Sequence, residues 1–413
     1  MTLSSEVISI CKATAPVLQE HGLAITQKFY ANLFQNHPYV NNLFNKSHVF
    51  PQNGQVSAQA SALANAVLGY ATYMDDLGQL TEAVKIIANK HVSLNIQPEH
   101  YQDVGTELLK SIKEILGDAA TDEIINAWKD AYFYLADILI GIEETMRKEL
   151  KEKGGWIGFE PFIVESKIPE TEDTTTFHLK RANGNPIPPF KAGQYLSLKF
   201  PQGTIADIDF DTLRNYSLSC GENSRYFQIT VKKEASSDVP PGLISNFLHG
   251  EVKEGDEILI GMPCGTFNLE DHDQKNLVFI SGGIGVTPNM SFLQSLRLET
   301  DRKIYFVQCV KKAENHVFAQ KVDELASKNP NLISHAFYSQ SQEKLKLSHT
   351  EIHSGRITGR GLKKIIEKTD LEDCHFYVCG PPGFTKCVLK TLEDEMNVPK
   401  GQIRFEYFGP QLQ

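Results

Sequence analysis

Prolines and glycines are spread unevenly along this chain, and their distribution limits what it can fold into more than any other feature. Only four of the nineteen prolines and seven of the twenty-nine glycines fall within residues 1–150. Proline interrupts helices and glycine weakens them, so the first 150 residues favour helices and the remainder favours strands and turns. At 413 residues the chain is too long for one compact core, and we expect two or three domains.

The first segment carries apolar residues at helical spacing. These patterns run over 4–20, 23–36, 57–76, 80–95, 99–116 and 122–151, and the prolines at 38, 51 and 98 fall between them. The last pattern ends in a charged tail that gives way to Gly154 and Gly155. We therefore predict an all-α domain over residues 1–153.

The sequence pattern in the middle of the chain predicts β-strands. After an extended, aromatic run, strand-like segments occupy 174–182, 193–200, 214–220, 226–234 and 256–263, with turn residues between them. This spacing is typical of a small antiparallel barrel or sandwich, which we place at residues 154–268.

The last third alternates strands with helices. Strand patterns at 276–282, 303–310, 332–339 and 374–380 are each followed by a helical pattern, at 289–299, 318–328, 359–368 and 386–396. Such alternation predicts a parallel sheet covered on both faces, with ligands beyond the carboxyl ends of its strands. We assign this α/β domain to residues 269–413.

Charge and composition exclude several classes of function. The net charge of −10 argues against nucleic acid or an anionic membrane as the main partner. No apolar run reaches the roughly 18 to 20 residues that cross a bilayer, and the N-terminus lacks the pattern of a signal peptide. The seven cysteines are scattered, without CxxC or CxxCH, which predicts reduced thiols, no zinc site and no covalently attached haem. We expect a cytoplasmic protein.

Four motifs in the second half follow one another in a specific order. They are "RNYS" at 214–217, "GLIS" at 242–245, "GGIGVTP" at 282–288 and "CGPPG" at 379–383, and an aromatic stretch, "FEYFGP", ends the chain. The glycine-rich turn would let backbone amides approach a pyrophosphate, although Pro288 replaces the third glycine of the usual fingerprint. The order resembles the ferredoxin-NADP reductase family over residues 155–413. The resemblance implies a barrel that holds FAD and an α/β domain that holds NAD(P)H.

Roles for individual residues follow from this resemblance. Arg214 would meet the FAD pyrophosphate, Tyr216 would stack on the flavin, and Ser217 would bond near its reactive nitrogen. Tyr195 would pack on the cofactor, and Phe408 would shield the flavin face that nicotinamide enters. The remaining predicted cofactor contacts are Asn215, Gly242, Leu243, Ile244, Ser245, Gly282, Gly283, Ile284, Gly285, Val286, Thr287, Cys379, Gly380, Pro381 and Tyr407. Lys311 and Lys312 either meet a 2′-phosphate or form a solvated strand end, so the choice between NADH and NADPH stays open.

One histidine in the helical domain stands where a leucine is expected. Val84, Ile87, His91 and Leu94 recur at steps of three and four, so the imidazole lies on an apolar helical face. It is either a core histidine with a hydrogen-bond partner or a ligand. A single imidazole from an all-α domain is what b-type haem needs as its proximal ligand.

Candidate residues for the opposite side of such a haem lie earlier in the chain. "KFYANLF" places Tyr30 between apolar residues, and "NNLFNKS" contains Phe44. Gln59 and Leu63, four residues apart, share one helical face.

The whole chain resembles a flavohaemoglobin, a globin joined to a reductase of the ferredoxin-NADP type, from about residue 5 to 410. The globin signatures are "FYANLFQNHP", "LFNKS", "KHVSLNIQPEHY" and "INAWKDAY". The resemblance makes His91 the iron ligand. It makes Tyr101 and Glu143 its hydrogen-bonded partners, although helix-start packing and surface exposure are the plain alternatives for these two.

The same resemblance assigns the distal pair and a domain contact. Tyr30 and Gln59 would form the distal hydrogen-bonding pair. The segment 46–59 is longer than is usual in the family, so Gln55 competes with Gln59 for that role. Lys90 and Glu406 match the family pair that lies where globin meets reductase.

The function that the resemblance implies is nitric oxide dioxygenase, which converts NO and O2 to nitrate at a haem reduced by NAD(P)H through FAD. The expected partners are therefore small molecules, O2 and NO, and we expect a monomer. The alternatives are a gas-binding or sensor globin whose reductase only keeps the iron ferrous, and a general flavin reductase of quinones, ferric chelates or hydroperoxides.

Overall fold

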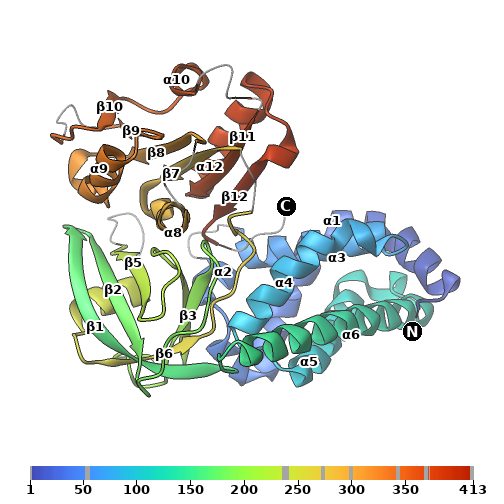
Figure 1. The fold of residues 1–413 in the computed structure, drawn as a ribbon. Coiled ribbons are helices and arrows are strands. Elements are labelled where there is room, and N and C mark those ends of the chain that lie inside the picture. The colour runs from blue at the N-terminus through green and yellow to red at the C-terminus, as the bar shows by residue number, and fades with distance from the viewer. Residues whose placement is uncertain are drawn as a thin grey trace.

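The protein has three parts that follow one another along the chain, and a computed structural model shows their arrangement (Figure 1). The structure describes residues 2–51, 56–234, 241–270, 275–296, 301–340, 345–366, 371 and 373–409. Helices form the N-terminal part, and the two sheets form the middle and C-terminal parts, as predicted. Within these ranges, no helix combines the length and the apolar character that crossing a membrane requires.

The N-terminal domain is built from six α-helices and short 3₁₀ turns within the described residues. The α-helices are α1 (Ser5–Asn36), α2 (Lys46–Val49), α3 (Ala58–Tyr73), α4 (Thr81–Ser93), α5 (Pro98–Leu116) and α6 (Asp122–Glu152). The 3₁₀ turns are η1 (Pro38–Asn42), η2 (Leu77–Leu80) and η3 (Gly117–Ala119).

One expectation for this domain was wrong, because the predicted helices 4–20 and 23–36 form a single helix, α1. Pro16 lies inside α1 and Gly22 faces Ala64 of α3. A continuous face that includes Cys11, Leu18, Ile25, Phe29 and Leu33 is buried along the whole helix. Tertiary packing of that face outweighs the local signals to break the helix.

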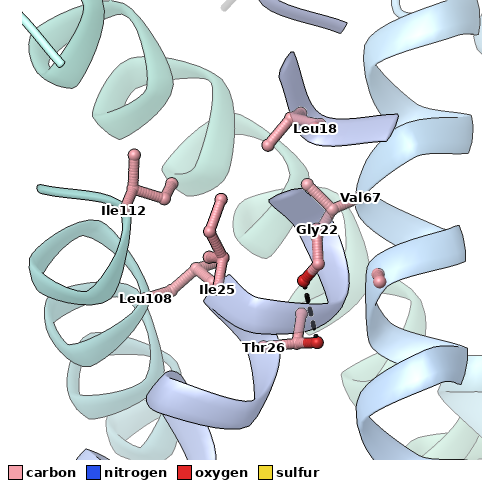
Figure 2. A pocket seen from close by; sticks show the side chains of 8 residues that line it. Leu18, Gly22, Ile25, Thr26, Val67, Leu108 and Ile112 are labelled. Atoms are coloured by element: carbon pink, nitrogen blue, oxygen red, sulfur yellow. Dashed lines mark hydrogen bonds between the residues drawn. The ribbon is translucent and has the colours of Figure 1, made fainter. Parts of the chain in front are cut away.

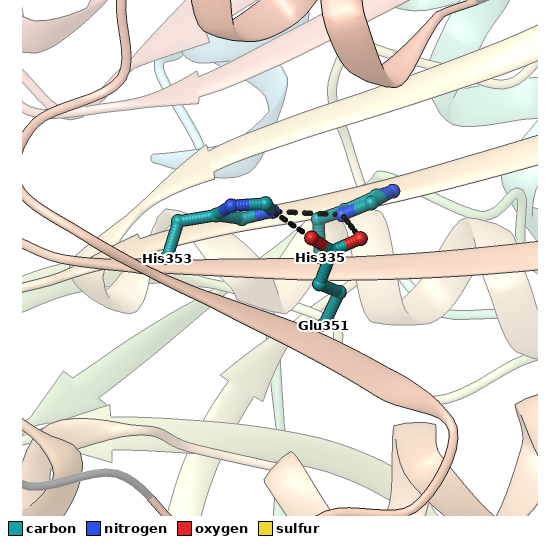
Figure 3. Close-up of side chains that lie close together, drawn as sticks. All are labelled: His335, Glu351 and His353. Carbon is teal, nitrogen blue, oxygen red and sulfur yellow. Dashed lines mark hydrogen bonds and ion pairs between the residues drawn. The ribbon is translucent and has the colours of Figure 1, made fainter.

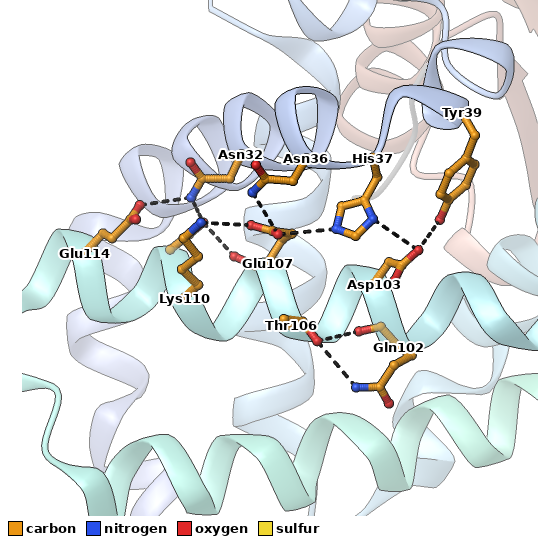
Figure 4. A network of polar contacts seen from close by, with 11 residues as sticks. Asn32, Asn36, His37, Tyr39, Gln102, Asp103, Thr106, Glu107, Lys110 and Glu114 are labelled. Carbon is orange, nitrogen blue, oxygen red and sulfur yellow. Dashed lines mark hydrogen bonds and ion pairs between the residues drawn. The ribbon is translucent and has the colours of Figure 1, made fainter.

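A network of polar side chains fixes the end of α1 against α5 (Figure 4). His37 lies between two carboxylates, with Nδ1 at 3.2 Å from Asp103 and Nε2 at 3.3 Å from Glu107. The Tyr39 hydroxyl donates to Asp103 at 2.8 Å, and the Asn36 amide donates to Glu107 at 2.9 Å. These contacts hold the helix that carries Tyr30 in a fixed position relative to the helix that carries Tyr101.

The globin core also contains a small apolar cavity between α1, α3 and α5 (Figure 2). Its only hydroxyl group belongs to Thr26, which donates to the backbone oxygens of Gly22 at 3.0 Å and Ala60 at 2.9 Å. A volume of about 10 Å³ is far too small for a cofactor. None of the predicted site residues lines this cavity.

The middle domain is an antiparallel barrel. Its strands pair in the order β4-β3-β6-β1-β2-β5. They are β1 (Phe159–Thr171), β2 (Thr174–Arg181), β3 (Tyr195–Phe200), β4 (Thr212–Ser217), β5 (Phe227–Lys232) and β6 (Glu257–Gly261). A bridge between Leu218 and Ile229 joins the two ends of the sheet and closes it. Helix α7 (Leu243–Gly250) packs Ile244 and Leu248 into the barrel core.

The C-terminal domain is a parallel sheet with helices on both faces. Its strands pair in the order β10-β9-β8-β7-β11-β12, and all of these pairs are parallel. They are β7 (Asn276–Gly282), β8 (Ile304–Val310), β9 (Leu332–Tyr338), β10 (Thr350–Ser354), β11 (Cys374–Gly380) and β12 (Ile403–Tyr407). The helices are α8 (Val286–Ser295), α9 (Ala319–Lys328), α10 (Gly359–Ile365) and α12 (Pro382–Lys390), and a π-helical turn, η6 (Thr391–Glu395), continues α12.

The two edge strands of this sheet, β10 and β12, had not been predicted, and neither had β1 of the barrel. Helix α8 begins at Val286, three residues before the expected start, so Pro288 lies in its first turn. Proline is well tolerated there because the first backbone N–H groups of a helix have no partner within it.

Candidate functional site

His91, on α4, forms a compact hydrogen-bonded cluster with side chains from two other helices. Its Nδ1 lies 2.8 Å from the Tyr101 hydroxyl and 2.8 Å from Glu143 Oε1. The Tyr101 hydroxyl in turn donates to the same carboxylate oxygen at 2.5 Å. Tyr101 sits in the first turn of α5, where Pro98 starts the helix, and Glu143 comes from the middle of α6.

This cluster decides which nitrogen of His91 carries its proton. Glu143 is only 1% exposed, and an ionised carboxylate can only accept hydrogen bonds. Burial, and next the hydrogen bond with Glu143, raise the pKa of Tyr101, so this hydroxyl keeps its proton. The imidazole proton therefore belongs on Nδ1, and Nε2 has a free lone pair; none of the described residues bonds to it.

Arg147, which the sequence reasoning missed, completes the surroundings of Glu143. It lies one helical turn further along α6, with Nη2 at 3.6 Å from Glu143 Oε2, and it donates to the backbone oxygen of Ile96. The spacing of four residues between a glutamate and an arginine was the available signal. Glu143 thus meets a positive charge on one side and two hydrogen-bond donors on the other. The surface-exposed alternative for Glu143 was wrong.

Tyr30 and Gln59 meet as a second polar pair in the globin. Gln59 Nε2, on α3, donates to the Tyr30 hydroxyl at 3.2 Å. Burial raises the pKa of Tyr30, which is 3% exposed, so the phenol stays protonated. Since its oxygen accepts from Gln59 and no described residue accepts its proton, the hydroxyl can donate to a ligand. Phe44 packs edge-on against Tyr30, with ring centroids 5.6 Å apart.

Gln55, the competitor for Gln59, lies outside the described residues. Leu63 follows Gln59 by one turn of α3 and, like Phe44, keeps part of its surface accessible. Ile87, one turn before His91 on α4, is also only partly buried. Accessible apolar side chains near a bare imidazole nitrogen and a spare hydroxyl proton fit a flat, apolar, metal-containing group such as haem.

The globin contacts the barrel through three asparagines that the sequence reasoning did not select. Asn42 Oδ1 accepts from the backbone of Asp211 at 3.0 Å, Asn45 Oδ1 accepts from Arg214 Nη2 at 2.9 Å, and Asn89 Oδ1 accepts from the backbone of Gly265 at 2.8 Å. Their partners lie more than one hundred residues away in the sequence, so no local pattern marks them.

Lys90, Tyr195 and Glu406 come together from all three domains. The Lys90 ammonium lies 5.6 Å from the centre of the Tyr195 ring. Burial lowers the pKa of Lys90 to about 8 and raises the pKa of Glu406 to about 7, and the mutual attraction of the two groups partly opposes both changes. All three side chains nevertheless keep accessible surface.

The expected flavin wall lies along β4, beside Tyr195 of β3. Ser217 pairs with Tyr195 across the two strands, and Tyr216 pairs with Leu196. Asn215 Oδ1 accepts from the Ser197 hydroxyl at 3.0 Å, but its Nδ2 is buried and finds no partner among the described residues. A buried amide without an acceptor is costly, so this wall fits a bound group that offers one.

Arg214, the predicted contact to pyrophosphate, donates to Asn45 and to the backbone oxygen of Leu213 at 2.7 Å. Both partners are neutral, and burial lowers its pKa. The guanidinium therefore has no carboxylate among the described residues that pairs with it within 4 Å, and it is suited to an added anion.

Three glycines of the glycine-rich turns lie at close contacts between elements. A Cβ atom at Gly285 would meet the backbone oxygen of Cys379 at 2.4 Å, and one at Gly282 or Gly380 would meet Phe384 at 2.7 or 2.6 Å. These glycines let β7, β11 and the helices after them approach closely. Gly283, with a φ of 55° and open space around it, remains the glycine suited to a phosphate.

The side chains of several predicted contacts are packed in a core or hydrogen-bonded within the protein. The side chains of Ile244 and Val286 are buried in apolar cores, and Cys379 is fully buried. The Thr287 hydroxyl donates to the backbone oxygen of Ile284 at 3.0 Å, and the Ser245 hydroxyl to that of Gly242 at 3.1 Å.

The other predicted contacts lie at or next to the ends of helices and strands. Leu243 is the first residue of α7, Pro381 precedes α12, and Tyr407 ends β12. Phe408 follows β12 with 44% of its surface exposed. Lys312 pairs with Glu314 at 3.3 Å on the surface, as a solvated strand end does.

An all-α domain with a histidine cluster, fused to a barrel and a nucleotide-binding type of sheet, defines a globin joined to a reductase. The family model of the globins matches residues 27–139, and that of the oxidoreductase NAD-binding domain matches residues 279–390. The chain is 39% identical to the flavohemoprotein of Bacillus subtilis (strain 168) over 99% of this chain and 98% of that one. It is 40% identical to the flavohemoprotein of Oceanobacillus iheyensis, over 99% and 97%. The chain therefore belongs to the flavohemoprotein family.

Solved structures agree with this assignment. The flavohemoglobin of Malassezia yamatoensis, solved with bound FAD and heme, superposes with a TM-score of 0.82 at 25% identity, over 99% of this chain and all of that one. The FAD/NAD-binding domain of the nitric oxide dioxygenase of Vibrio cholerae matches with a TM-score of 0.54 at 30% identity, over 61% and 99%.

Proposed function

We propose that this protein is an NAD(P)H-dependent nitric oxide dioxygenase that converts NO and O2 to nitrate. The observation that carries the proposal is the pairing, in one globin, of a charge-donating histidine cluster with a tyrosine that has a spare proton. A reductase in the same chain supports repeated turnover. The similarity to the FAD/NAD-binding domain of the nitric oxide dioxygenase of Vibrio cholerae adds support.

The proposed cofactors are haem b, FAD and NAD(P)H. When bound, the haem supplies an iron that takes O2 and exchanges single electrons, and FAD supplies acceptance of a hydride followed by release of single electrons. His91 Nε2 would hold the iron. Arg214, Asn215, Tyr216, Ser217 and Tyr195 would hold FAD, and the turns after β7 and β11 would hold NAD(P)H.

On the proximal side, the chain's own residues set the basicity of His91. Glu143 accepts the hydrogen bond of the imidazole N–H and is itself held by Tyr101 and Arg147. A carboxylate in this position makes the imidazole a stronger electron donor, as it does in other metal sites. It also keeps the ring in one orientation.

On the distal side, Tyr30 holds a proton at its hydroxyl, and this hydroxyl would donate a hydrogen bond to O2. Gln59 keeps the phenol in position by donating to its oxygen. A hydrogen bond to a charged acceptor is stronger than one between neutral groups, so this hydroxyl would favour a ligand that carries negative charge. We propose that Gln59, rather than Gln55, is the distal partner of Tyr30.

Between the domains, Lys90 and Glu406 are proposed to set the electrostatics of the site where flavin would lie. Phe408, exposed after β12, is proposed to cover the flavin face until nicotinamide replaces it. We further propose domain limits at 1–153, 154–268 and 269–413, a monomeric state, and the cytoplasm as the location, where NAD(P)H is available.

The test is a sequential mixing experiment on the full-length protein. The protein is reduced anaerobically with NADH, mixed with O2 and then with NO, and nitrate is measured. We expect one nitrate for each NO consumed. A gas-binding protein would bind O2 without sustained NO-dependent oxidation of NADH, and a general flavin reductase would reduce quinones or ferric chelates at rates that NO does not change. Failure to form nitrate in stoichiometric amount would contradict the proposal.

A further inference from the structure

A cluster of two histidines and a glutamate lies on the C-terminal sheet, on strands outside the predicted cofactor contacts (Figure 3). His335 comes from β9, and Glu351 and His353 come from the edge strand β10. One ligand-type atom from each residue lies within 4.8 Å of the others. His335 Nδ1 and His353 Nε2 face each other at 3.0 Å.

The strand pairing explains why these three side chains share one face. Glu351 pairs with His335, and His353 pairs with Phe337, in a parallel register. Side chains two residues apart on a strand point to the same face, so all four project together. The intervening residues, Ala336 and Ile352, pack into a separate cluster on the opposite face.

The histidines are held in place before any ligand arrives. The His353 ring stacks on Phe337, with centroids 4.6 Å apart and planes at 22°. Asp323 of α9 accepts from the backbone N–H groups of Ser348 and His349 at 3.0 and 2.8 Å, which fixes the chain just before β10. The strand and the ring are therefore fixed independently of each other.

The glutamate supplies charge and can still move. Glu351 is 68% exposed, and its oxygens lie 3.7 Å from His335 Nδ1 and 3.8 Å from His353 Nε2. An open hollow of about 330 Å³ adjoins His335 and Glu351. The exposed carboxylate has room to turn toward both nitrogens, and the hollow gives water access to His335 and Glu351.

We propose that His335, His353 and Glu351 form a binding site for a divalent transition metal ion, with zinc as the best match. In a tetrahedral zinc site, bonds of about 2.0 to 2.1 Å place neighbouring ligand atoms about 3.3 Å apart. The three separations here, 3.0, 3.7 and 3.8 Å, bracket that value. Imidazole ligands favour zinc and its transition-metal neighbours over magnesium or calcium.

Metal binding at this position would join the edge strand to the body of the sheet. β10 is the last strand of its sheet, and among the described strands it pairs with β9 alone. A ligand that binds the folded state alone stabilises it by mass action, so the metal should stabilise the C-terminal domain. The site is independent of the proposed dioxygenase reaction, because none of its residues belongs to the proposed haem, FAD or NAD(P)H contacts.

The test uses the tag-free, full-length protein stripped of metal with a chelator. Equilibrium dialysis against Zn²⁺, with metal measured by mass spectrometry, gives the number of ions bound at each free concentration. We expect His353→Gln and Glu351→Gln to weaken one site at least about tenfold. His353→Cys should keep zinc, because a thiolate is also a zinc ligand. Mg²⁺ should not compete.

The matched control is His21→Gln, which removes a surface histidine whose one carboxylate partner within 4 Å among the described residues is Glu20, at 4.0 Å. It should bind as many zinc ions as the wild type. Zinc should raise the melting temperature of the wild type and of His21→Gln more than that of His353→Gln, and all three should melt alike in chelator. Equal zinc stoichiometry and affinity in the wild type and His353→Gln would overturn the proposal and leave a hydrogen-bonded histidine pair with a solvated carboxylate.

Discussion

The histidine cluster of the globin and the β4 wall of the barrel differ in where their hydrogen-bond partners come from. Around His91, Nδ1, the Tyr101 hydroxyl and Glu143 Oε1 are hydrogen-bonded to one another within one domain, and His91 Nε2 has no partner among the described residues. Along β4, Arg214 donates a hydrogen bond to Asn45 of the globin, and Asn215 Nδ2 has no partner among the described residues. The proximal side is thus built by the domain itself, whereas the flavin side needs both docking and a cofactor to be complete.

The largest expected effect comes from removing the imidazole. His91→Ala should abolish retention of haem while NAD(P)H still reduces the flavin, because the two sites share no side-chain ligand. An absorption spectrum and anaerobic flavin reduction measure both properties. His21→Ala, on the exposed surface of α1, is the control and should keep both. Full haem occupancy in His91→Ala would show that the self-contained cluster is not the iron site.

Removing the charge behind the imidazole should have the next largest effect. Glu143→Gln keeps the size of the side chain but removes the carboxylate that holds the Nδ1 proton. Losses of about 10- to 100-fold are typical when such a partner is removed, and we expect that range in the NO turnover number. The neighbouring Glu144, exposed on the same helix, provides the control Glu144→Gln. Unchanged turnover and an unchanged iron reduction potential would contradict the role given to Glu143.

Loss of the distal hydroxyl of Tyr30 should mainly increase the rate at which O2 dissociates. Tyr30→Phe removes the donor without changing the packing against Phe44. A hydrogen bond to a charged group contributes about 1.5 to 3 kcal/mol, so the O2 dissociation rate should rise by about tenfold or more. Stopped-flow displacement of O2 measures this rate. Tyr73→Phe, on an exposed tyrosine, should leave it unchanged, and an unchanged rate in Tyr30→Phe would remove this residue from the site.

The smallest expected effect concerns Glu406 and the pH dependence of stability. Burial raises the pKa of Glu406 from 4.5 to about 7, so the folded state holds its proton more tightly than the unfolded state does. The associated stability is present below about pH 4.5 and is lost as pH rises through about 7. The Glu406→Gln variant cannot ionise at this position. As pH rises from about 4.5 to about 7, the free energy of unfolding of the variant should therefore increase by about 1 kcal/mol relative to that of the wild type. This value allows for the accessible surface of Glu406 and for the charge of Lys90.

Urea unfolding of the apoprotein at several pH values measures this difference. Glu314→Gln, at an exposed glutamate, should follow the wild type throughout. A constant difference between Glu406→Gln and the wild type from pH 4.5 to 7 would show that burial does not raise the pKa of this carboxyl group.

Much of the fold could be predicted because local patterns and tertiary packing agree over most elements. The long helices α5 and α6 were predicted closely, since each has one apolar face and defined ends. Strand β1 was missed because Pro161 and Pro169 lower its strand signal. Pro161 lies outside the pairing with β2, which begins at Phe162, so the missing N–H does not interrupt that ladder.

The site residues also divide into those that the sequence could predict and those that only the tertiary structure showed. His91 could be found because a polar residue on an apolar helical face is visible in the sequence, and Tyr30, Tyr101 and Glu143 came with the family resemblance. Arg147 had a local signal, its four-residue spacing from Glu143, that was not used. Asn45 and Asn89 had no local signal in the sequence, since their partners belong to another domain.

By itself, the sequence determined the three fold classes, the order of the domains and the motifs for flavin and nucleotide, because helical and strand periodicity and glycine placement are local properties of a chain. Only the tertiary structure decided which nitrogen of His91 is free, which asparagines join the globin to the barrel, and that two histidines meet a glutamate at the edge of the last sheet. Those facts depend on distances between residues far apart along the chain, and such distances are set by how the elements pack.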